Sequence, residues 1–387
     1  MKILHVIRGL ENSSGTTHVV GPLTEEQAKL GHEISVFFVE KTSSPPALPD
    51  PALVRSAKFP VTLANGHPGV SLPFARRMSA AVGCFDVVHV HAIWNFPTFY
   101  AMRAANRARV PYMVAPQGSL EPWAIAAGSW HRRLYARHIE KPLIDRAARL
   151  QALTPMEEAQ FRAFGLSAPA AIIPNGVQPD WLSSPRVRLP AKLELPADSK
   201  VLLFLSRLHK KKGLDILLKG FARFARERAD VVLIIAGDDA GSGYGEELRS
   251  LARSLAVDDK CRFVGEVRGA EKARLFAGAD AFALTSHSEG LPVAVIEAMA
   301  SRLPVLATAR CNLPQIAAAD AGLLVAAEPD TVADALLELF ADEDRMRAQG
   351  CNGRRLVAEH FTWPAIARQT IAVYEEMIAD TRSRRVV

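Results

Sequence analysis

The chain has 387 residues, 49% of them hydrophobic and 23% charged, with a formal net charge of +6. This balance is typical of a globular protein, and the length exceeds what one ordinary core supports, so we expect two domains. No stretch approaches the roughly 20 apolar residues that span a bilayer. The start, M-K-I-L-H-V-I, resembles a first strand and lacks the features of a signal peptide.

The four cysteines, at positions 84, 261, 311 and 351, are scattered and have no metal-ligand spacing. A reduced, cytoplasmic protein fits this pattern. The positive charge would suit an anionic partner such as nucleic acid, a membrane surface or a phosphorylated substrate. Basic residues are not interleaved with aromatic ones, so we do not expect a nucleic-acid partner.

Candidate strands alternate with helical stretches along the whole chain. The strands expected in the first half are 2–7, 34–39, 86–91, 110–115 and 149–154, and those in the second half are 201–206, 231–236, 262–265, 280–286 and 304–308. Helical patterns include 214–228, 244–255, 270–277 and 363–379. Such alternation predicts parallel sheets covered on both faces, and two series of it predict two doubly wound α/β domains.

The proline-rich stretch 178–199 is the expected linker between a domain over 1–177 and a domain over 200–362. The last helix, 363–379, follows both series and could pack on either domain. Open parallel sheets bind ligands beyond the carboxyl ends of their strands, so the expected site is a cleft at those ends.

Three segments of the first half carry residues of interest. The Gly-rich loop from Gly9 to His18 could approach a phosphate, but it is not G-x-G-x-x-G. In D-V-V-H-V-H-A-I-W, His89 and His91 project to one side of a strand; no acid or cysteine completes a metal set nearby. We expect His91 in the cleft and His89 in the core. The segment 130–150 carries Arg and Lys opposite apolar residues, which is typical of a membrane-surface helix and also of an ordinary packed helix with a solvated face.

In the second half, V-L-L-F-L-S-R-L-H-K-K-K-G-L-D places cations at the end of a buried strand and before a helix. Arg207 offers a planar fork and Lys212 a point charge, and both suit a diphosphate. We favour this interpretation over the alternative, a solvated basic loop without a ligand.

The stretch S-E-G-L-P-V-A-V-I-E-A-M-A places Glu289 in a loop and Glu297 two turns into a helix. The backbone N–H groups of Gly290, Leu291 and Val293 at this helix start could hold an anion, while the two acids could hold sugar hydroxyls. A capped helix with Glu297 on its solvent face explains the same residues equally well.

Together these stretches resemble the family 4 retaining glycosyltransferases with the GT-B fold. The resemblance covers nearly the whole chain and rests on the E-x7-E stretch, on S-R-L-H-K-K-K-G-L-D, on P-N-G-V and on D-V-V-H-V-H-A-I-W. The segment A-P-Q-G-S-L-E-P-W-A, residues 115–124, is similar to members that build bacterial surface polysaccharides. The resemblance to the family implies two Rossmann-like domains facing a central cleft, with the last helix packing back on the acceptor-side N-terminal domain.

The resemblance also implies roles. Arg207 and Lys212 hold the donor diphosphate, Glu289 lies by the transferred sugar, and Glu297 binds the ribose hydroxyls. Further implied contacts are those of the Gly290, Leu291 and Val293 amides with sugar and phosphate, and of His91 with the sugar's primary hydroxyl. Gly15 is also implied as a binding residue, in a loop that approaches the phosphate or the acceptor. Gly15 matches the second glycine of a Gly-Gly loop whose first position is Ser14 here.

The implied reaction is retaining, metal-independent and cofactor-free transfer of a hexose from a UDP- or GDP-sugar to a glycan or lipid-linked acceptor. Exopolysaccharide, O-antigen or capsule assembly is the implied setting, at the inner face of the membrane if the 130–150 segment binds it. Two rivals remain: a nucleotide-sugar epimerase, which needs no acceptor, and an inactive nucleotide-binding scaffold.

Overall fold

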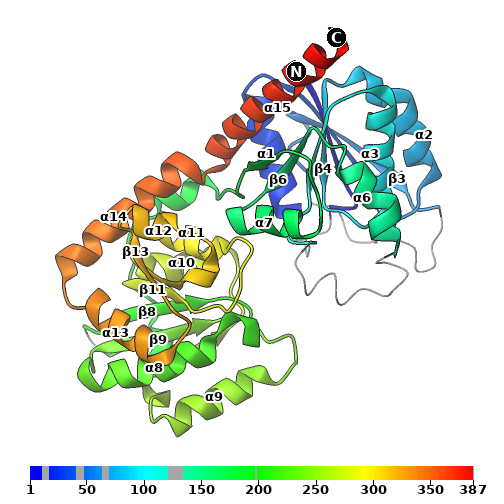
Figure 1. The fold of residues 1–387 in the computed structure, drawn as a ribbon. Coiled ribbons are helices and arrows are strands. Elements are labelled where there is room, and N and C mark those ends of the chain that lie inside the picture. Colours follow the sequence, from blue (N-terminus) through cyan, green and yellow to red (C-terminus); the bar gives the residue numbers. More distant parts are fainter. Residues whose placement is uncertain (11–16, 41–47, 63–68, 121–133, 197, 387) are drawn as a thin grey trace. The chain divides into compact units, whose positions relative to one another are not determined.

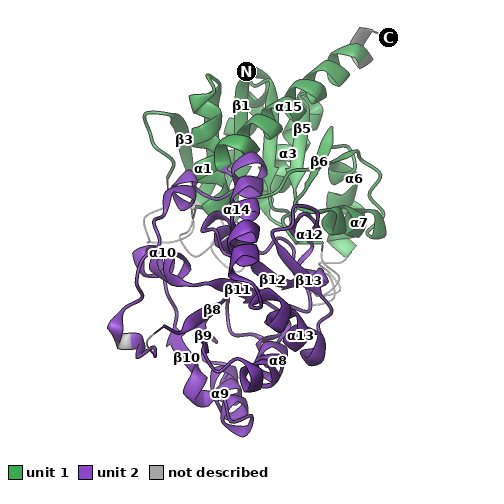
Figure 2. Ribbon diagram, turned by 90° about the vertical axis from the view of Figure 1, so that its left-hand side faces the viewer, with its two compact units in different colours: residues 1–176, 363–387 green, residues 177–362 purple. Residues whose placement is uncertain are grey.

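The computed structural model describes residues 1–10, 17–40, 48–62, 69–120, 134–196 and 198–386 (Figure 1). The chain forms two compact units, Met1–Gly176 with Trp363–Val387, and Val177–Thr362 (Figure 2). Each unit is an α/β structure built on its own parallel sheet, which confirms the predicted fold class.

The first unit has a sheet of seven described strands in the order β3-β2-β1-β4-β5-β6-β7. Their bounds are β1 (Lys2–Ile7), β2 (Glu33–Glu40), β3 (Val54–Pro60), β4 (Val87–His91), β5 (Tyr112–Ala115), β6 (Arg149–Ala152) and β7 (Ala170–Ile172). The helices are α1 (Thr17–Lys29), α2 (Leu72–Ala81), α3 (Phe96–Ala108), α6 (Lys141–Ile144), α7 (Pro155–Ala163) and α15 (Trp363–Val386), with a π-helical stretch at Ala136–Glu140.

Side chains of β1 alternate between two cores, one on each face of this sheet. Leu4 and Val6 join the core that includes α2 and α3 residues, whereas Ile3 and Ile7 join the core that contains Trp363 and Tyr374 of α15. His5, between Ile3 and Ile7, therefore points toward the face covered by α1 and α15. The last helix thus packs on the first unit, where Tyr374 is fully buried.

The second unit repeats this topology with six described strands in the order β10-β9-β8-β11-β12-β13. The strands are β8 (Lys200–Leu205), β9 (Val231–Ala236), β10 (Cys261–Gly265), β11 (Ala281–Leu284), β12 (Val305–Thr308) and β13 (Gly322–Val325). The helices are α8 (Leu214–Glu227), α9 (Tyr244–Ser254), α10 (Gly269–Gly278), α11 (Val293–Ala300), α12 (Gln315–Ala318), α13 (Pro329–Leu339) and α14 (Glu343–His360).

The predicted buried strands are all present, but sequence analysis missed β3, β7 and β13. Each is an edge strand. Edge strands are short or polar because one side faces no partner, and β3 has the alternating exposed sequence V-R-S-A-K-F-P. The predicted strand 280–286 is also too long: β11 ends at Leu284. The Thr285 hydroxyl instead donates to Gly213 of another loop, and the Ser286 hydroxyl donates to Glu289 of its own loop.

The stretch 178–199, expected as a linker, lies inside the second unit. It contains two short 3-10 helices, Pro179–Ser183 and Ala191–Leu193, and Leu193 is buried in the core of that unit. Gly176 of the P-N-G-V stretch ends the first unit's first segment, and a Cβ there would lie 2.8 Å from the backbone N of Trp363. The glycine is thus required by close approach to the start of α15.

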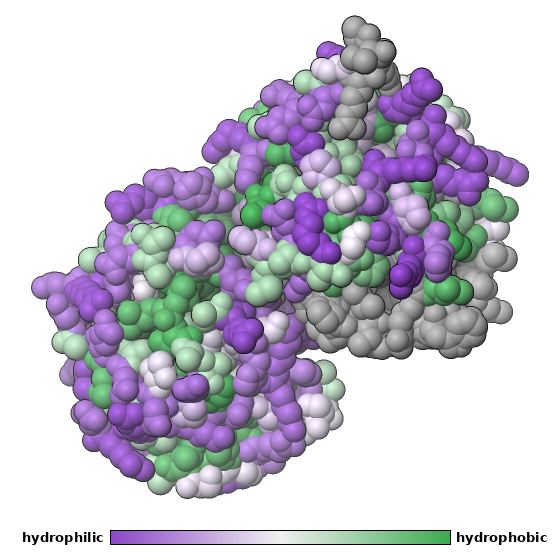
Figure 3. Space-filling model, in the orientation of Figure 1, coloured by the Kyte–Doolittle hydropathy of each residue, from purple (hydrophilic) through white to green (hydrophobic). Residues whose placement is uncertain are grey.

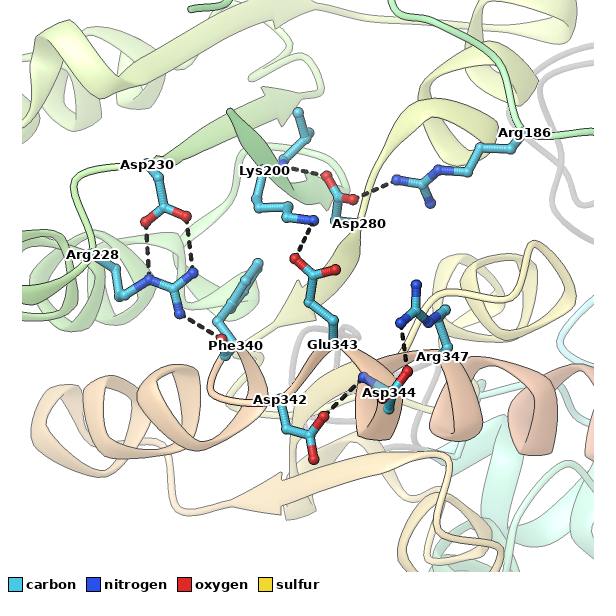
Figure 4. A network of polar contacts seen from close by, with 11 residues as sticks. Arg186, Lys200, Arg228, Asp230, Asp280, Phe340, Asp342, Glu343, Asp344 and Arg347 are labelled. Atoms are coloured by element: carbon cyan, nitrogen blue, oxygen red, sulfur yellow. Dashed lines mark hydrogen bonds and ion pairs between the residues drawn. The ribbon is translucent and has the colours of Figure 1, made fainter. Parts of the chain in front are cut away.

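A polar network secures the amino ends of strands in the second sheet (Figure 4). Lys200 at the start of β8 pairs with Glu343 at 2.8 Å, and Arg228 pairs with Asp230 just before β9. Asp280, just before β11, accepts from the backbone N of Val201 at 2.7 Å. These charges lie at the amino-end edge of the sheet. The sequence predicts the site at the opposite edge, where the carboxyl ends of the strands lie.

Hydrophobic residues on the face drawn in Figure 3 lie in small groups among hydrophilic ones. Within the described ranges, no helix has the length and apolar character needed to cross a bilayer.

Candidate functional site

The basic loop after β8 turns sharply at Gly213. Residues Lys210–Lys212 form one 3-10 turn, and Gly213 then adopts φ +64°, a left-handed conformation that favours glycine. A Cβ at this position would lie 2.1 Å from the carbonyl O of Thr285. The sequence K-K-K-G therefore folds tightly onto the end of β11.

Hydrogen bonds join this basic loop to the loop that follows β11. The Thr285 hydroxyl donates to the carbonyl O of Gly213 at 2.7 Å, and the backbone N of His287 donates to the carbonyl O of Lys211 at 2.8 Å. The structure thus brings together two segments predicted to carry the site, although 77 residues separate Lys212 from Glu289.

Lys212 and Glu289 form a largely buried ion pair. The Lys212 Nζ donates to both carboxylate oxygens of Glu289, at 2.7 and 2.9 Å, and the two side chains are 15% and 8% exposed. The Ser286 hydroxyl donates to Glu289 Oε1 at 2.6 Å. Because an ammonium has three donors, Lys212 keeps one N–H for a further acceptor.

The backbone around Glu289 is fixed from the end of β12. The Glu289 N donates to the carbonyl O of Arg310 at 3.0 Å, and the Asn312 side-chain amide donates to the carbonyl O of Glu289. The Thr308 hydroxyl donates to the carbonyl O of Ser286 at 2.6 Å. Glu289 is therefore held at the carboxyl ends of β8, β11 and β12.

Helix α11 begins directly after this loop. Pro292 is its N-cap residue and makes no side-chain cap bond to the first turn. The first N–H groups of a helix have no intrahelical partner, and this end carries partial positive charge. Gly290 and Leu291 are half-buried and Val293 is 37% exposed, so this helix start borders the Lys212–Glu289 pair along the chain.

Glu297 is buried, which excludes the alternative of a capped helix with Glu297 on its solvent face. It is 6% exposed and its Oε1 accepts from Lys272 Nζ of α10 at 2.6 Å. The Lys272 ammonium also lies 5.6 Å from the centre of the Trp181 ring. Burial raises the pKa of the Glu297 carboxyl, and Lys272 opposes that rise.

Arg207 lies in the same loop as Lys212 but is exposed. Its guanidinium has no hydrogen bond or ion pair to any residue that the structure describes. It is thus a cation on the carboxyl edge of the second sheet that can bind an outside anion bidentately.

In the first unit, His91 belongs to a buried network of three histidines. His5 faces His89 in the β1–β4 register, and His5 Nδ1 lies 2.9 Å from His91 Nε2. His5 Nε2 lies 2.8 Å from Gln27 Oε1, and His89 Nδ1 lies 2.6 Å from the Tyr374 hydroxyl. All three histidines are fully buried.

The bond to Gln27 fixes the proton positions in this network. His5 Nε2 donates to the Gln27 oxygen, so His5 Nδ1 accepts from His91 Nε2 and His91 Nδ1 is left as an acceptor without a partner. Burial lowers the pKa of His5 to about 4 and the pKa values of His89 and His91 well below 6.5. The three rings are therefore neutral at pH 7.

The three histidines offer one ring nitrogen each within 4.8 Å of one another, and His5 is a third candidate ligand that the sequence did not suggest. Neutral imidazole nitrogens are good metal ligands. However, His5 Nδ1 and His91 Nε2 already form a hydrogen bond with each other. That the protein uses no metal stays a prediction.

Sequence reasoning missed His5, Ser286, Lys272 and Asn312. Strand pairing offered a signal for His5, because the predicted first strand and the strand at 86–91 could be adjacent. The other three contact the predicted acids from loops or helices, and no motif marked them. Gly15 lies outside the described residues.

The segment 130–150 is not one continuous helix. In its described part, helical structure runs through Ala136–Glu140 and Lys141–Ile144, and β6 begins at Arg149. Leu134 and Ile139 are 53% and 49% exposed.

Comparison with known proteins adds relatives for both units. The family model for glycosyl transferases group 1 matches residues 186–356, and the glycosyl transferase 4-like domain matches residues 14–176. The chain is 28% identical to a D-inositol 3-phosphate glycosyltransferase of Kineococcus radiotolerans, over 97% of this chain and 94% of that protein. It is 32% identical to a D-inositol 3-phosphate glycosyltransferase of Nocardioides sp., over 81% of this chain and 73% of the relative.

Among solved structures, Anabaena Alr3699/HepE in complex with UDP has a similar fold. Its TM-score is 0.74 at 19% sequence identity, with 97% of this chain and 100% of that chain covered.

Proposed function

The chain belongs to the family 4 glycosyltransferases of the GT-B fold, and from this premise we propose that it moves a hexose-type sugar from a nucleoside-diphosphate sugar to a glycan or lipid-linked acceptor. The observation that carries the proposal is the junction of the two loops, where Lys212 donates to both oxygens of Glu289 at 2.7 and 2.9 Å. A cation for phosphate and an acid for sugar hydroxyls are thereby held at one sheet edge.

Each predicted residue has a role in this proposal. Arg207 and the third N–H of Lys212 bind the donor diphosphate together with the N–H groups of Gly290, Leu291 and Val293 at the start of α11. Glu289 accepts from hydroxyls of the transferred sugar, and Glu297 accepts from the ribose. The bound UDP in the Anabaena structure supports a uridine nucleotide as the first donor to test.

The reaction breaks the bond between the anomeric carbon and the phosphate oxygen. Negative charge then grows on the leaving diphosphate, and Arg207, Lys212 and the helix amides stabilise it electrostatically. Such fixed positive groups can replace a divalent cation. We propose that the acceptor hydroxyl attacks from the side of the leaving group and passes its proton to the departing diphosphate oxygen, which retains the configuration; a sugar found covalently on Glu289 would contradict this.

His91 is the proposed contact to the sugar's primary hydroxyl. Its Nδ1 is an unpartnered acceptor, and the His5–Gln27 chain fixes this tautomer. A hydroxyl that donates to Nδ1 would complete the network. Because the ring is neutral, it binds the hydroxyl without adding charge beside the developing oxocarbenium ion.

The proposed acceptor belongs to bacterial surface-polysaccharide assembly and is presented at an anionic membrane surface. Exposed Leu134 and Ile139 beside exposed Arg137 support such a contact. Co-sedimentation with vesicles of anionic and of neutral lipids tests it. Binding to anionic vesicles that persists after combined Leu134→Ser, Arg137→Ser and Ile139→Ser substitution would contradict it.

The activity itself is tested by incubating the protein with UDP-, GDP- and ADP-hexoses, with and without lipid-linked glycan acceptors. We expect release of one nucleoside diphosphate that depends on an acceptor, survives chelation of metals, and yields a product of retained anomeric configuration. Interconversion of the donor without acceptor would favour an epimerase, and donor binding without turnover would favour a scaffold.

A further inference from the structure

Glu297 has one bonded and one unbonded carboxylate oxygen. Its Oε1 accepts from Lys272 Nζ at 2.6 Å, whereas its Oε2 is buried and has no partner within the described part of the chain. Buried carboxylate oxygens are almost always hydrogen-bonded, so an unpartnered one calls for a donor that the described chain does not supply.

Lys272 is itself held in place. Its side chain is 25% exposed, and its ammonium lies 5.6 Å from the centre of the Trp181 ring. The Trp181 ring in turn packs edge-on against Phe276, with 5.3 Å between the ring centres. An indole face attracts a cation without competing for its N–H groups, so the ammonium stays directed at Glu297.

The two acids of the E-x7-E stretch have similar environments, because each forms a shielded ion pair with a lysine. Among the ion pairs of the described residues, Lys212–Glu289 and Lys272–Glu297 are the two least exposed, with both carboxylate side chains at 8%. Other lysine–glutamate pairs are open to water, as in Lys200–Glu343 with a glutamate 61% exposed. Surface pairs of that kind contribute little, whereas a shielded pair fixes charge and direction.

An ionised carboxylate is purely an acceptor, and two neighbouring hydroxyls of a ribose are its natural donors. A neutral carboxyl would carry its own hydrogen on one oxygen and would accept less well. Lys272 favours the ionised form, and it occupies one oxygen so that the carboxylate plane has a fixed orientation.

We propose that Lys272 is a positioning residue of the nucleotide site, which holds the Glu297 carboxylate ionised and oriented to accept from the ribose hydroxyls of a nucleoside diphosphate. This inference rests on the proposed function. It assigns Lys272 a role in discriminating ribonucleotides from deoxyribonucleotides, whereas Arg207 and Lys212 recognise the diphosphate that both share.

The test measures calorimetric affinity for UDP, GDP and ADP, and for the 2′,3′-dideoxy form of whichever one binds. Loss of a charge-assisted hydrogen bond corresponds to about tenfold in affinity. We expect Lys272→Met to lower the affinity for the ribonucleotide about tenfold and to leave the affinity for the dideoxy nucleotide unchanged. Lys272→Arg should restore most of the loss, because it keeps the charge and the donors.

Lys260→Met is the matched control, because the bonds of Lys260 to the described residues go only to the backbone carbonyls of Ala225 and Ala229, both at 3.3 Å. It should bind both nucleotides like the wild type. Equal weakening of the ribo and dideoxy forms by Lys272→Met, or no weakening, would overturn the inference while leaving the proposed function intact.

If Lys272→Met does not fold, Lys272→Gln takes its place with the same expected selectivity. A wild type that binds none of the three diphosphates would overturn both the inference and the proposed function. A wild type that binds ribo and dideoxy forms equally would overturn the inference alone.

Discussion

Replacing Gly213 by alanine should loosen the second unit and weaken its nucleotide site. Gly213 has φ +64°, and a left-handed alanine costs about 1 kcal/mol. Its Cβ would lie 2.1 Å from the Thr285 carbonyl O, so the two loops must separate. Overpacking of this kind and loss of the Thr285–Gly213 hydrogen bond add about 2 kcal/mol, for a total of about 3 kcal/mol.

Gly241→Ala is the matched control for this substitution. Gly241 has φ +76° in the same unit, and nothing lies within 4 Å of a Cβ placed there. It should therefore cost only the conformational part, about 1 kcal/mol. Urea unfolding gives both losses in the free energy of unfolding, and calorimetry gives the affinity for a nucleoside diphosphate.

We expect Gly213→Ala to lower this affinity as well, because Lys212 is its neighbour and would move away from Glu289. Gly241→Ala should leave the affinity unchanged. Equal losses of stability in the two variants would refute the close approach of the loops, and an unchanged affinity in Gly213→Ala would refute its connection to the site.

Other expected outcomes concern the buried charges. Lys212→Met should cost about 3 kcal/mol of unfolding free energy and abolish nucleotide binding, because it leaves the Glu289 carboxylate buried without its cation, whereas exposed Lys210→Met should do neither. Stability should fall between pH 6.5 and 4, because unfolded His5 takes up a proton near pH 6.5 and folded His5 only near pH 4, about 3 kcal/mol by pH 4. Urea titrations across this range check the trend, and a flat profile would contradict it. Tyr374→Phe should destabilise the first unit by about 1 kcal/mol, since it removes the bond to His89.

The interior strands could be predicted because parallel strands covered on both faces are apolar throughout, as in V-V-L-I-I-A of β9. The edge strands could not, because β3 alternates with charged residues and β7 has three residues. The carboxyl-edge location of Arg207, Lys212 and Glu289 could be predicted because each follows a predicted strand of a parallel sheet and lies in a local motif.

The partners of these residues were harder to predict. Lys272 lies 25 residues before Glu297, on another helix, and a single lysine in G-A-E-K-A-R carries no mark of its contact. His5 joins His91 only because β1 and β4 are neighbours in the sheet. The burial of Glu297 likewise depends on α10 and Trp181 packing beside α11, which local sequence does not encode.

Thermal stabilisation by UDP, GDP, ADP and NAD at equal concentration, on the wild type and on Arg207→Ala, tests the central claim most directly. A ligand at about 100 times its Kd adds about 2.7 kcal/mol to the stability of the form that binds it. We predict that one nucleoside diphosphate raises the melting temperature of the wild type and not of Arg207→Ala. No shift with any diphosphate, or a shift with NAD alone, would contradict a nucleotide-sugar site on the second unit.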